Sequence, residues 1–356
     1  MKRILIVSGG TGGHIFPALA FGKWIRNNKK TNEIYYMCGS RKVELDIYNS
    51  EGIDPIVLDI EGSPLGTREF RRILNRSCAL MKETGKIFGF FKNIRPDFCL
   101  LFGGYVSIIP LIIAILFRIP VAVHEQNTVS GRVTRLAHKL GISVLTGWEE
   151  CEPFDSTSFS HVGIPVRKFI RLQEMDAWNI LHIGCSLRDS PTVVVMGGSL
   201  GSEGLVRIIV QTARRQIFSN WNFIVLGKKK DGLYNCPMNV FFTGKQWDMN
   251  PVFSVADVAV VRGGASSLAE LYVYGIPALV VPWLKSSDSH QLKNAEYFLK
   301  KGSGEMWIEE KDSLETFAKR LNSVFLKYGD TLEPTGNIEL RRSIACETIW
   351  EHMIAL

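Results

Sequence analysis

A histidine stands directly after a run of glycines near the start of the chain. The segment Gly9-Gly10-Thr11-Gly12-Gly13-His14 follows the apolar run 4–7 and precedes a helical pattern over 15–25. Bare backbone amides at a helix N-terminus attract anions such as phosphates. The positive end of the helix dipole also favours the neutral form of a histidine there, which suits a general base. The alternative for a lone histidine is a structural side chain that caps or packs.

The same arrangement occurs a second time, far along the chain. The apolar run 193–196 leads into Gly197-Gly198-Ser199-Leu200-Gly201-Ser202 and then into another helical pattern. The first copy lacks the glycine spacing of a dinucleotide fingerprint and is not followed by the Lys-Ser/Thr pair of a Walker A loop. The repetition therefore predicts two similar α/β domains, each with its own anion-binding turn.

Strand-like and helical runs alternate along the chain, which is typical of doubly wound parallel sheets. We expect strands at 4–7, 34–37, 56–58, 98–101, 121–124 and 144–146, and again at 193–196, 223–226, 240–243, 258–261 and 278–281. At 356 residues the chain is also too long for one ordinary domain. We predict an N-terminal domain over 1–162, a linker over 163–168, a C-terminal domain over 169–336, and a last helix over 337–356 that packs back on the N-terminal domain.

Polar or small residues follow two further strands of the first half. Gly103, Gly104 and Tyr105 come after one strand, and the His124-Glu125-Gln126-Asn127 segment follows the next. Loops at the carboxyl ends of parallel strands line the ligand crevice of such folds. We interpret Glu125 and Asn127 as site residues, the alternative being a solvated turn, and Glu125 is the second candidate for the base after His14.

In the second half, a small-residue turn joins a strand to a helix at Arg262-Gly263-Gly264-Ala265-Ser266-Ser267-Leu268-Ala269-Glu270. Glu270 lies about one helical turn in and could accept hydrogen bonds from a vicinal diol such as a ribose. A polar cluster over 288–294 follows the next strand. No Asp-x-Asp segment occurs, so no metal chelate for a diphosphate is expected. The candidates to bind the negative charge of a diphosphate are therefore Arg167, Arg262 and the amides after Ser199.

The positive charge of the chain is concentrated in one stretch. The formal net charge is +7, and residues 66–95 carry eight basic and two acidic side chains. Apolar residues are interleaved at helical spacing, so the stretch predicts a basic amphipathic helix. Such a face can meet a nucleic acid or an anionic membrane surface. The alternative is an ordinary core-facing helix with a solvated basic side.

The most apolar stretch, 108–119, is too short to cross a membrane. As a helix it would span roughly 18 Å, against about 30 Å for a hydrocarbon core, and Arg118 interrupts it. It is therefore either a helix buried against the sheet or a surface that dips into a bilayer.

The seven cysteines are scattered without a CxxC pair, which favours reduced cytosolic thiols over zinc or disulfides. The chain begins directly with a strand, so no signal peptide is expected.

Several of these segments, taken in order, closely resemble the MurG family of glycosyltransferases (glycosyltransferase family 28). The matching segments are Gly9–Ala20, Gly103–Ser107, His124–Asn127, Val162–Arg167, Gly197–Ser199, Arg262–Glu270 and Asp288–Asn294. The resemblance implies a GT-B fold, in which two Rossmann-like domains face a central cleft. It also implies an enzyme that transfers GlcNAc from UDP-GlcNAc to lipid I, which yields lipid II for peptidoglycan. No cofactor and no metal are implied.

The resemblance assigns roles to individual residues. Glu270 would hold the ribose hydroxyls, with Arg262 and Gln246 beside the uracil. Ser199 and Arg167 would lie near the diphosphate, Gln291 at the sugar hydroxyls, and Asn127 would reach the donor from the first domain. The remaining residues implied for donor binding are the loop Thr11, Gly12 and Gly13, the turn Ala265, Ser266, Ser267, Leu268 and Ala269, and Asn294. Gly103, Gly104 and Tyr105 would belong to the acceptor side.

In this family the acceptor domain binds the inner membrane through an apolar patch ringed by basic residues. The resemblance therefore favours a peripheral enzyme at the cytoplasmic face of that membrane, attached through 66–95 and 108–119, and no nucleic acid as partner. It leaves His14 and Glu125 as the two candidates for the base.

The chain departs from the family at Ile164, Leu200 and His290, where Asn, Gln and Gln are usual. The first two departures remove polar side chains near the diphosphate, and the third alters the expected sugar contacts. Two other functions remain open at this stage. One is a nucleotide-sugar or anionic-lipid binder without activity, and the other is a UDP-GlcNAc epimerase or related lipid glycosyltransferase of the same fold.

Overall fold

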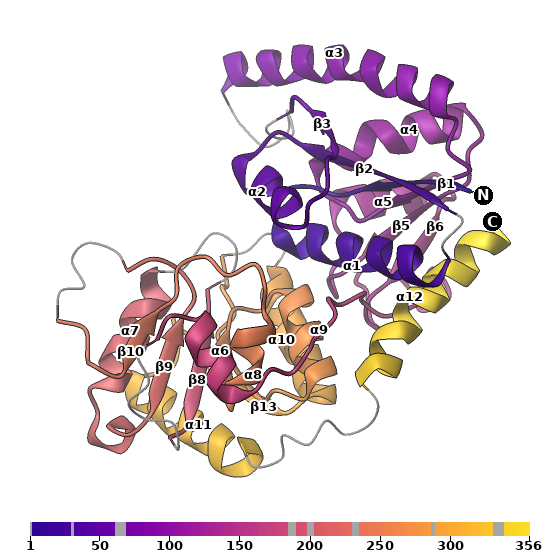
Figure 1. The fold of residues 1–356 in the computed structure, drawn as a ribbon. Helices are drawn as coiled ribbons and strands as arrows, with labels where there is room; N and C mark the ends of the chain where they lie inside the picture. The colour runs from indigo at the N-terminus through magenta and orange to yellow at the C-terminus, as the bar shows by residue number, and fades with distance from the viewer. Residues whose placement is uncertain are drawn as a thin grey trace. The chain divides into compact units, whose positions relative to one another are not determined.

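The chain forms two compact units, which are described separately here (Figure 1). Unit 1 comprises Met1–Arg167 with Glu339–Leu356, and unit 2 comprises Lys168–Ile338. The structure is a computed structural model that describes residues 2–29, 32–60, 69–183, 190–197, 203–229, 235–285, 289–329 and 338–356.

Unit 1 is built on a parallel sheet of seven strands. Its order is β3 (Ile56–Leu58), β2 (Glu33–Gly39), β1 (Arg3–Val7), β4 (Phe98–Leu101), β5 (Val121–Glu125), β6 (Ser143–Thr146) and β7 (Ser160–His161). The central strands β1, β4 and β5 consist mostly of buried apolar residues because helices cover both faces of the sheet. All six predicted strands are confirmed, whereas β7 was not predicted because its two residues carry no apolar run.

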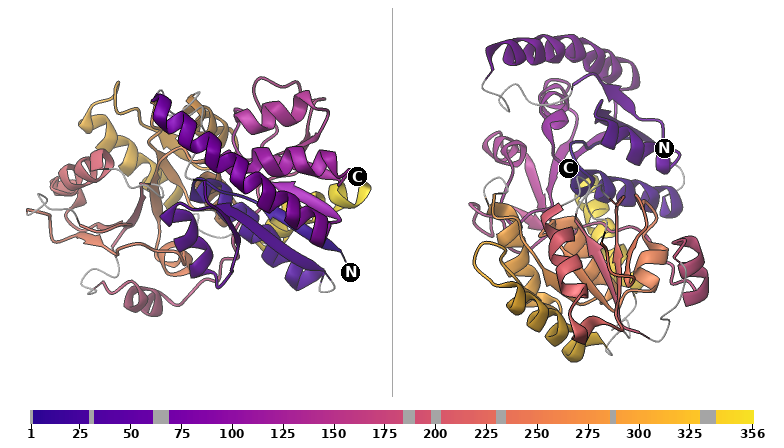
Figure 2. Two further views of the ribbon diagram at one scale, coloured as in Figure 1. Left: turned by 90° about the horizontal axis from the view of Figure 1, so that it is seen from above. Right: turned by 90° about the vertical axis from the view of Figure 1, so that its left-hand side faces the viewer.

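Helices cover the two faces of this sheet (Figures 1 and 2). They are α1 (Gly12–Asn28), α2 (Lys42–Ser50), α3 (Phe70–Ile94), α4 (Ile108–Leu116) with a 3-10 turn before it (Tyr105–Ser107), α5 (Arg132–Lys139) and α12 (Ile338–Ala355). Leu5 and Val7 of β1 pack in one core with Phe91 of α3 and Leu111 of α4. On the helix α1, Trp24 Nε1 donates to Ser343 Oγ of α12 at 3.0 Å.

Unit 2 is built on a second parallel sheet, of six strands. Its order is β10 (Val240–Phe242), β9 (Asn222–Val225), β8 (Thr192–Met196), β11 (Val258–Val261), β12 (Ala278–Val280) and β13 (Gly304–Met306). The five predicted strands are confirmed. The sequence does not reveal β13, because this edge strand is only half-buried and contains a glycine and a glutamate.

The helices of unit 2 are α6 (Glu174–Ile180), α7 (Glu203–Ala213), a 3-10 turn (Gln216–Phe218), α8 (Asn250–Ser254), α9 (Ala265–Tyr274), α10 (His290–Lys301) and α11 (Leu314–Tyr328). Val193 and Val195 of β8 pack with Leu205 of α7 and Phe317 of α11 in the core of this unit. Both sheets thus have helix-connected parallel strands, and the predicted doubly wound α/β architecture is confirmed.

Candidate functional site

The strand order of unit 1 reverses between β1 and β4, and the loops after these two strands carry predicted site residues. In open parallel sheets a ligand binds outside the carboxyl ends of the strands at such a reversal. The neighbouring strand β5 ends in the His124–Asn127 segment. We call the segments 8–14, 102–107 and 124–131 the unit 1 rim.

Two glycines allow the second loop of this rim to lie directly against the first. Gly103 and Gly104 have φ values of 86° and 81°, which favour glycine. A Cβ on Gly104 would stand 2.3 Å from the carbonyl oxygen of Gly9, and one on Gly103 would stand 3.4 Å from the His14 ring. The close packing of the two loops therefore depends on glycine and brings backbone up to the imidazole of His14.

Helix α1 begins at this rim. Thr11 is its N-cap residue, is extended, and makes no side-chain capping hydrogen bond within the described residues. Gly12 is buried, Gly13 is exposed and His14 is half-buried. The first amides of α1 and the positive end of its dipole therefore lie beside His14, an arrangement that suits a negatively charged ligand.

His14 is connected to the end of β5 through a chain of hydrogen bonds. Its Nδ1 lies 2.7 Å from Gln126 Oε1. Gln126 Nε2 lies 2.9 Å from His124 Nδ1 and donates to the His124 carbonyl oxygen at 2.8 Å. His124 Nε2 lies 2.8 Å from the carbonyl oxygen of Gly163. Burial lowers the pKa of His124 to about 4, so its ring is neutral at neutral pH.

Glu125 is buried and its carboxylate accepts four hydrogen bonds. Oε1 accepts from the backbone amide and from Nδ2 of Asn127, each at 3.0 Å. Oε2 accepts from the amide of Gly131 at 2.8 Å and from Thr134 Oγ1 at 2.6 Å. Four donors compensate a carboxylate for the loss of water. Glu125 therefore fixes the side chain of Asn127 and the start of α5.

Tyr105 is tied to a second buried carboxylate. Its hydroxyl lies 2.8 Å from Glu44 Oε1 and 2.8 Å from the carbonyl oxygen of Ile60. Glu44 Oε2 accepts from the amide of Gly39 at 2.7 Å. Burial, with Glu44 beside it, raises the pKa of Tyr105. Tyr105 thus anchors the loop after β4 to the end of β2, and Glu44 is a positioning residue that the sequence did not reveal.

The strand order of unit 2 reverses between β8 and β11. Ser199 follows β8 but lies outside the described residues, as does Asp288. The loop after β11 is Arg262-Gly263-Gly264, and it leads into α9. We call the segments 262–270, 281–285 and 289–294 the unit 2 rim.

Arg262 is held at this rim by an ion pair. Its Nη2 lies 3.2 Å from Glu309 Oε2. Its Nη1 donates to the carbonyl oxygen of Val281 at 3.2 Å and to the same carboxylate oxygen at 3.3 Å. The guanidinium is therefore oriented before any ligand binds. Glu309 was not predicted, because no motif surrounds it in the sequence.

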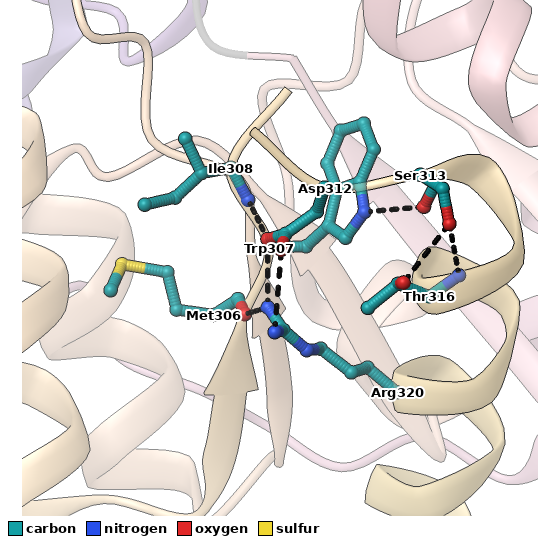
Figure 3. Close-up of polar contacts among 7 residues, drawn as sticks. All are labelled: Met306, Trp307, Ile308, Asp312, Ser313, Thr316 and Arg320. Carbon is teal, nitrogen blue, oxygen red and sulfur yellow. Dashed lines mark hydrogen bonds and ion pairs between the residues drawn. The ribbon is translucent and has the colours of Figure 1, made fainter. Parts of the chain in front are cut away.

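The loop that carries Glu309 is itself fixed by a polar network (Figure 3). Asp312 Oδ2 accepts from the amide of Ile308 at 2.8 Å and from Arg320 Nη1 at 2.9 Å. Arg320 also donates to the carbonyl oxygen of Met306 at the end of β13. This network between β13 and α11 keeps the partner of Arg262 in place.

Helix α10 packs closely against the loop before α9 and is hydrogen-bonded to it. A Cβ on Gly263 would stand 2.1 Å from the carbonyl oxygen of Gln291. Asn294 is fully buried, and its Nδ2 donates to the carbonyl oxygen of Gly263 at 3.0 Å. Gln291 Oε1 accepts from the amide of Trp283 at 3.0 Å. Gln291 and Asn294, both predicted to bind the donor, thus each use one side-chain atom for a hydrogen bond within the unit 2 rim.

The other predicted donor-binding residues occupy several elements. Residues 265–269 form the first part of α9, and Glu270 follows them and is 5% exposed. In unit 2, Gln246 Nε2 donates to the carbonyl oxygen of Thr243 at 2.9 Å. In unit 1, the guanidinium of Arg167 stacks on the ring of Phe16 at 4.1 Å.

Two of the three departures from the family lie within the described residues. Ile164 is 6% exposed and packs against Gly147, where a Cβ would stand 2.2 Å from Ile164 Cγ1. His290 is half-buried at the start of α10. Leu200 lies outside the described residues. An apolar residue at 164 is therefore explained by packing within unit 1.

The described residues contain no group of three or more His, Cys, Asp or Glu side chains that could hold a metal ion. In the same part of the chain, no helix has both the length and the apolar character needed to span a bilayer.

Apolar side chains are exposed along α3 and α4 of unit 1, which lie against one another. Met81 and Leu116 are each 69% exposed, and Phe88, Ile112 and Ile115 are also exposed. The ring of Phe88 packs edge-on against Phe117 with 5.0 Å between centroids. The exposed basic side chains of these segments include Lys82, Lys92 and Arg118. We call this surface the α3–α4 face.

The buried Leu111 and the exposed Leu116 show that α4 is both a core helix and a surface helix.

Two doubly wound units, each with a small-residue rim at its strand reversal, match the two-domain architecture of GT-B glycosyltransferases, and the family comparison identifies the chain as a glycosyltransferase. Residues 4–146 match the glycosyltransferase family 28 N-terminal domain, and residues 192–338 match the C-terminal domain of the same family. The chain therefore belongs to glycosyltransferase family 28.

Similar proteins carry the name UDP-N-acetylglucosamine–N-acetylmuramyl-(pentapeptide) pyrophosphoryl-undecaprenol N-acetylglucosamine transferase. One from Desulfotalea psychrophila is 30% identical over 326 residues, which cover 87% of this chain and 84% of that protein. One from Protochlamydia amoebophila is 26% identical over 336 residues, which cover 90% and 86%. Among solved structures, Acinetobacter baumannii MurG is 20% identical, covers 100% of both chains and has a TM-score of 0.71.

Proposed function

We propose that this protein transfers GlcNAc from UDP-GlcNAc to the 4-hydroxyl of the MurNAc residue in undecaprenyl-pyrophosphoryl-MurNAc-pentapeptide (lipid I). The product is lipid II, and UDP leaves. The observation that carries this proposal is the histidine of the unit 1 rim, held by Gln126 at 2.7 Å beside the N-terminus of α1, in a chain of this family.

In this mechanism His14 acts as the general base. It removes the proton of the acceptor hydroxyl as the oxygen attacks C1 of GlcNAc. The oxygen attacks the face of C1 opposite to the diphosphate while the bond from C1 to the diphosphate breaks, so the configuration at C1 is inverted and UDP leaves with the bonding electrons. The amides at the start of α1 and the side chains of Arg167 and Ser199 stabilise the charge that develops on the diphosphate. The mechanism contains no metal step.

We assign Glu125 a positioning role in place of the predicted alternative as base. Each of its two carboxylate oxygens already accepts two hydrogen bonds from the protein, so neither oxygen has to turn to the acceptor hydroxyl to satisfy its hydrogen-bonding capacity. Glu125 instead holds Asn127 toward the donor. In the same way, Asn294 positions the Gly263 loop through its bond to the Gly263 carbonyl oxygen.

On the donor side we retain the remaining predicted roles. Glu270 accepts hydrogen bonds from the ribose hydroxyls, and Gln291 contacts the sugar. Arg262 and Gln246 lie at the uracil. The ion pair with Glu309 supports this assignment, because it orients the guanidinium and lowers the entropy lost when the donor binds.

The test measures UDP release by the purified protein with and without a water-soluble lipid I analogue, for several UDP-sugars and in the presence of EDTA. We expect release only with the analogue, a strong preference for UDP-GlcNAc, and no effect of EDTA. Consumption of donor without acceptor would identify an epimerase or hydrolase. Binding of UDP-GlcNAc without turnover would identify a binding protein, and turnover abolished by EDTA would contradict the metal-free mechanism.

We further propose that the α3–α4 face attaches the protein peripherally to the cytoplasmic face of the inner membrane. Apolar side chains that are already exposed lose water on insertion, and the basic side chains beside them attract anionic headgroups. The double variant Ile112→Ser/Leu116→Ser should bind anionic lipid vesicles about 10-fold or more weakly. Its turnover of a water-soluble acceptor should stay unchanged. Unchanged vesicle binding would contradict this assignment, and Ile217→Ser in unit 2, which is 60% exposed, is the matched control.

A further inference from the structure

We propose that Gln126 and His124 act as positioning residues that hold His14 in the Nδ1–H tautomer, so that Nε2 carries the lone pair that accepts the proton. The catalytic consequence rests on the proposed function, whereas the tautomer itself does not. The inference follows from the directions of four hydrogen bonds, each of which restricts the next.

The first of these hydrogen bonds involves the carbonyl oxygen of Gly163, which can only accept a hydrogen. His124 Nε2 lies 2.8 Å from it and must therefore carry a hydrogen. Gly163 is itself held, because its amide donates to the carbonyl oxygen of Thr146 at 3.2 Å. Gly163 has a φ of 83°, a conformation that favours glycine. A Cβ at this position would stand 3.1 Å from the Cβ of Ala345 in α12. Backbone contacts therefore fix the position of the Gly163 carbonyl oxygen, the first acceptor in this series of hydrogen bonds.

The ring of His124 is 1% exposed and neutral at neutral pH, as its lowered pKa requires. A neutral imidazole with its hydrogen on Nε2 has a lone pair on Nδ1. His124 Nδ1 is therefore an acceptor and needs a donor opposite it. The ring also stacks at 5.1 Å on that of Phe102, which limits its rotation.

Gln126 supplies that donor. Its Nε2 faces two acceptors, His124 Nδ1 at 2.9 Å and the His124 carbonyl oxygen at 2.8 Å. The opposite orientation of the amide would place an oxygen against both of them and lose both hydrogen bonds. The amide orientation is therefore determined, and Oε1 of Gln126, which can only accept, is directed at His14.

The last step fixes the tautomer of His14. Nδ1 lies 2.7 Å from an oxygen that cannot donate, so Nδ1 carries the hydrogen. Nε2 is then the nitrogen that can remove a proton from the acceptor hydroxyl. Without Gln126, the neutral ring would populate both tautomers, and the Nε2–H form cannot act as the base through that nitrogen.

The experiment uses the full-length protein with 15N-labelled histidine, and long-range 1H–15N spectra at pH 8 report the tautomer. The His14 signals are assigned by their absence in His14→Ala. We expect the Nδ1–H form of His14 in the wild-type protein and a mixed or Nε2–H form in Gln126→Ala.

In the transfer assay, Gln126→Ala should lower kcat about 10- to 100-fold with KM for UDP-GlcNAc changed less than twofold. His124→Leu, which leaves the carbonyl acceptor in place, should have a smaller effect. Tyr35→Phe is the control, because it removes a hydrogen bond of 3.0 Å to Glu33 Oε2 in the first half of β2, outside the unit 1 rim. It should leave the tautomer and kcat unchanged.

An Nε2–H tautomer of His14 in the wild-type protein would overturn the proposal, even if Gln126→Ala does not fold. So would a Gln126→Ala protein with an unchanged tautomer. If the tautomer changes as expected but no transfer to lipid I occurs, the positioning of His14 stands and the proposed function fails.

Discussion

The rims of the two units occupy equivalent places in sheets of the same strand order, yet they carry different chemistry. The unit 1 rim holds imidazoles and an amide that orient one another, from Gly163 through Gln126 to His14. The unit 2 rim holds an oriented guanidinium, a buried carboxylate and the start of α9. The first set can move a proton, whereas the second can bind anions and hydroxyls.

In both sheets the strand reversal sets the place where a ligand can bind, and the loop residues set which chemical groups that ligand would meet. Even the supporting glycines are equivalent. Gly104 follows β4 and Gly263 follows β11, the strands beside the reversal in each sheet, and a side chain on either would strike a backbone oxygen at 2.3 Å or 2.1 Å. The predicted division of labour can be tested by changing matched residues in the two rims.

The largest effect is expected for His14→Ala. Loss of the base should lower kcat by about 10²–10⁴-fold, with KM for UDP-GlcNAc nearly unchanged because we assign donor binding to unit 2. Steady-state kinetics with a lipid I analogue measure both constants. His352→Ala removes a histidine of α12 whose Nδ1 lies 2.9 Å from the carbonyl oxygen of Thr348 in the same helix, and it should leave them unchanged. A His14→Ala protein that folds and retains full kcat would remove His14 as the base.

The opposite pattern is expected for Glu270→Ala in unit 2. Loss of a charged hydrogen-bond acceptor for the ribose should raise KM for UDP-GlcNAc about 10- to 100-fold and change kcat little. Glu296→Ala, at an exposed position of α10, is the control. If Glu270→Ala lowered kcat without changing donor binding, the two rims would not divide the reaction in this way.

The paired glycine variants compare the two rims directly. Gly104→Ala and Gly263→Ala should each lower the free energy of unfolding by about 2 kcal/mol, because the added methyl group meets backbone. We expect Gly104→Ala to lower kcat and Gly263→Ala to raise KM for the donor. Urea unfolding and kinetics measure the two quantities. In Gly89→Ala the added methyl meets nothing within 4 Å, so this helix substitution should stabilise the protein by about 0.5–1 kcal/mol.

The smallest effect concerns the pH dependence of stability. The pKa of His124 in the folded protein is about 4, below its ordinary value of 6.5, so only the unfolded chain takes up this proton between those values. Stability is then complete above pH 6.5 and falls as the pH drops toward 4, by about 1 kcal/mol at pH 5.5. Comparison of urea unfolding at pH 5.5 and 7.5 should show this loss in the wild type and not in His124→Leu. Equal pH dependence in both proteins would mean that His124 is not held neutral.

The architecture was predictable because apolar runs between glycine turns mark buried parallel strands. The edge strand β13 was missed, since Gly304-Glu305-Met306 has no such run. The position of His14 was also predictable, because its loop and helix are local in sequence. Its partner Gln126 was not, because that contact joins residues 112 positions apart and depends on how two loops pack. The same reason hid the pairing of Arg262 with Glu309, and the four donors around Glu125 could not be read from a motif.

The central claim is that this protein transfers GlcNAc from UDP-GlcNAc to the 4-hydroxyl of the MurNAc residue of lipid I. The most direct test is the structure of the product formed from UDP-GlcNAc and a lipid I analogue, determined by NMR of the purified disaccharide. The account predicts one GlcNAc in β linkage to the 4-hydroxyl of MurNAc, with one UDP released for each bond formed. An α linkage, attachment at another hydroxyl, or UDP released without a disaccharide would contradict it.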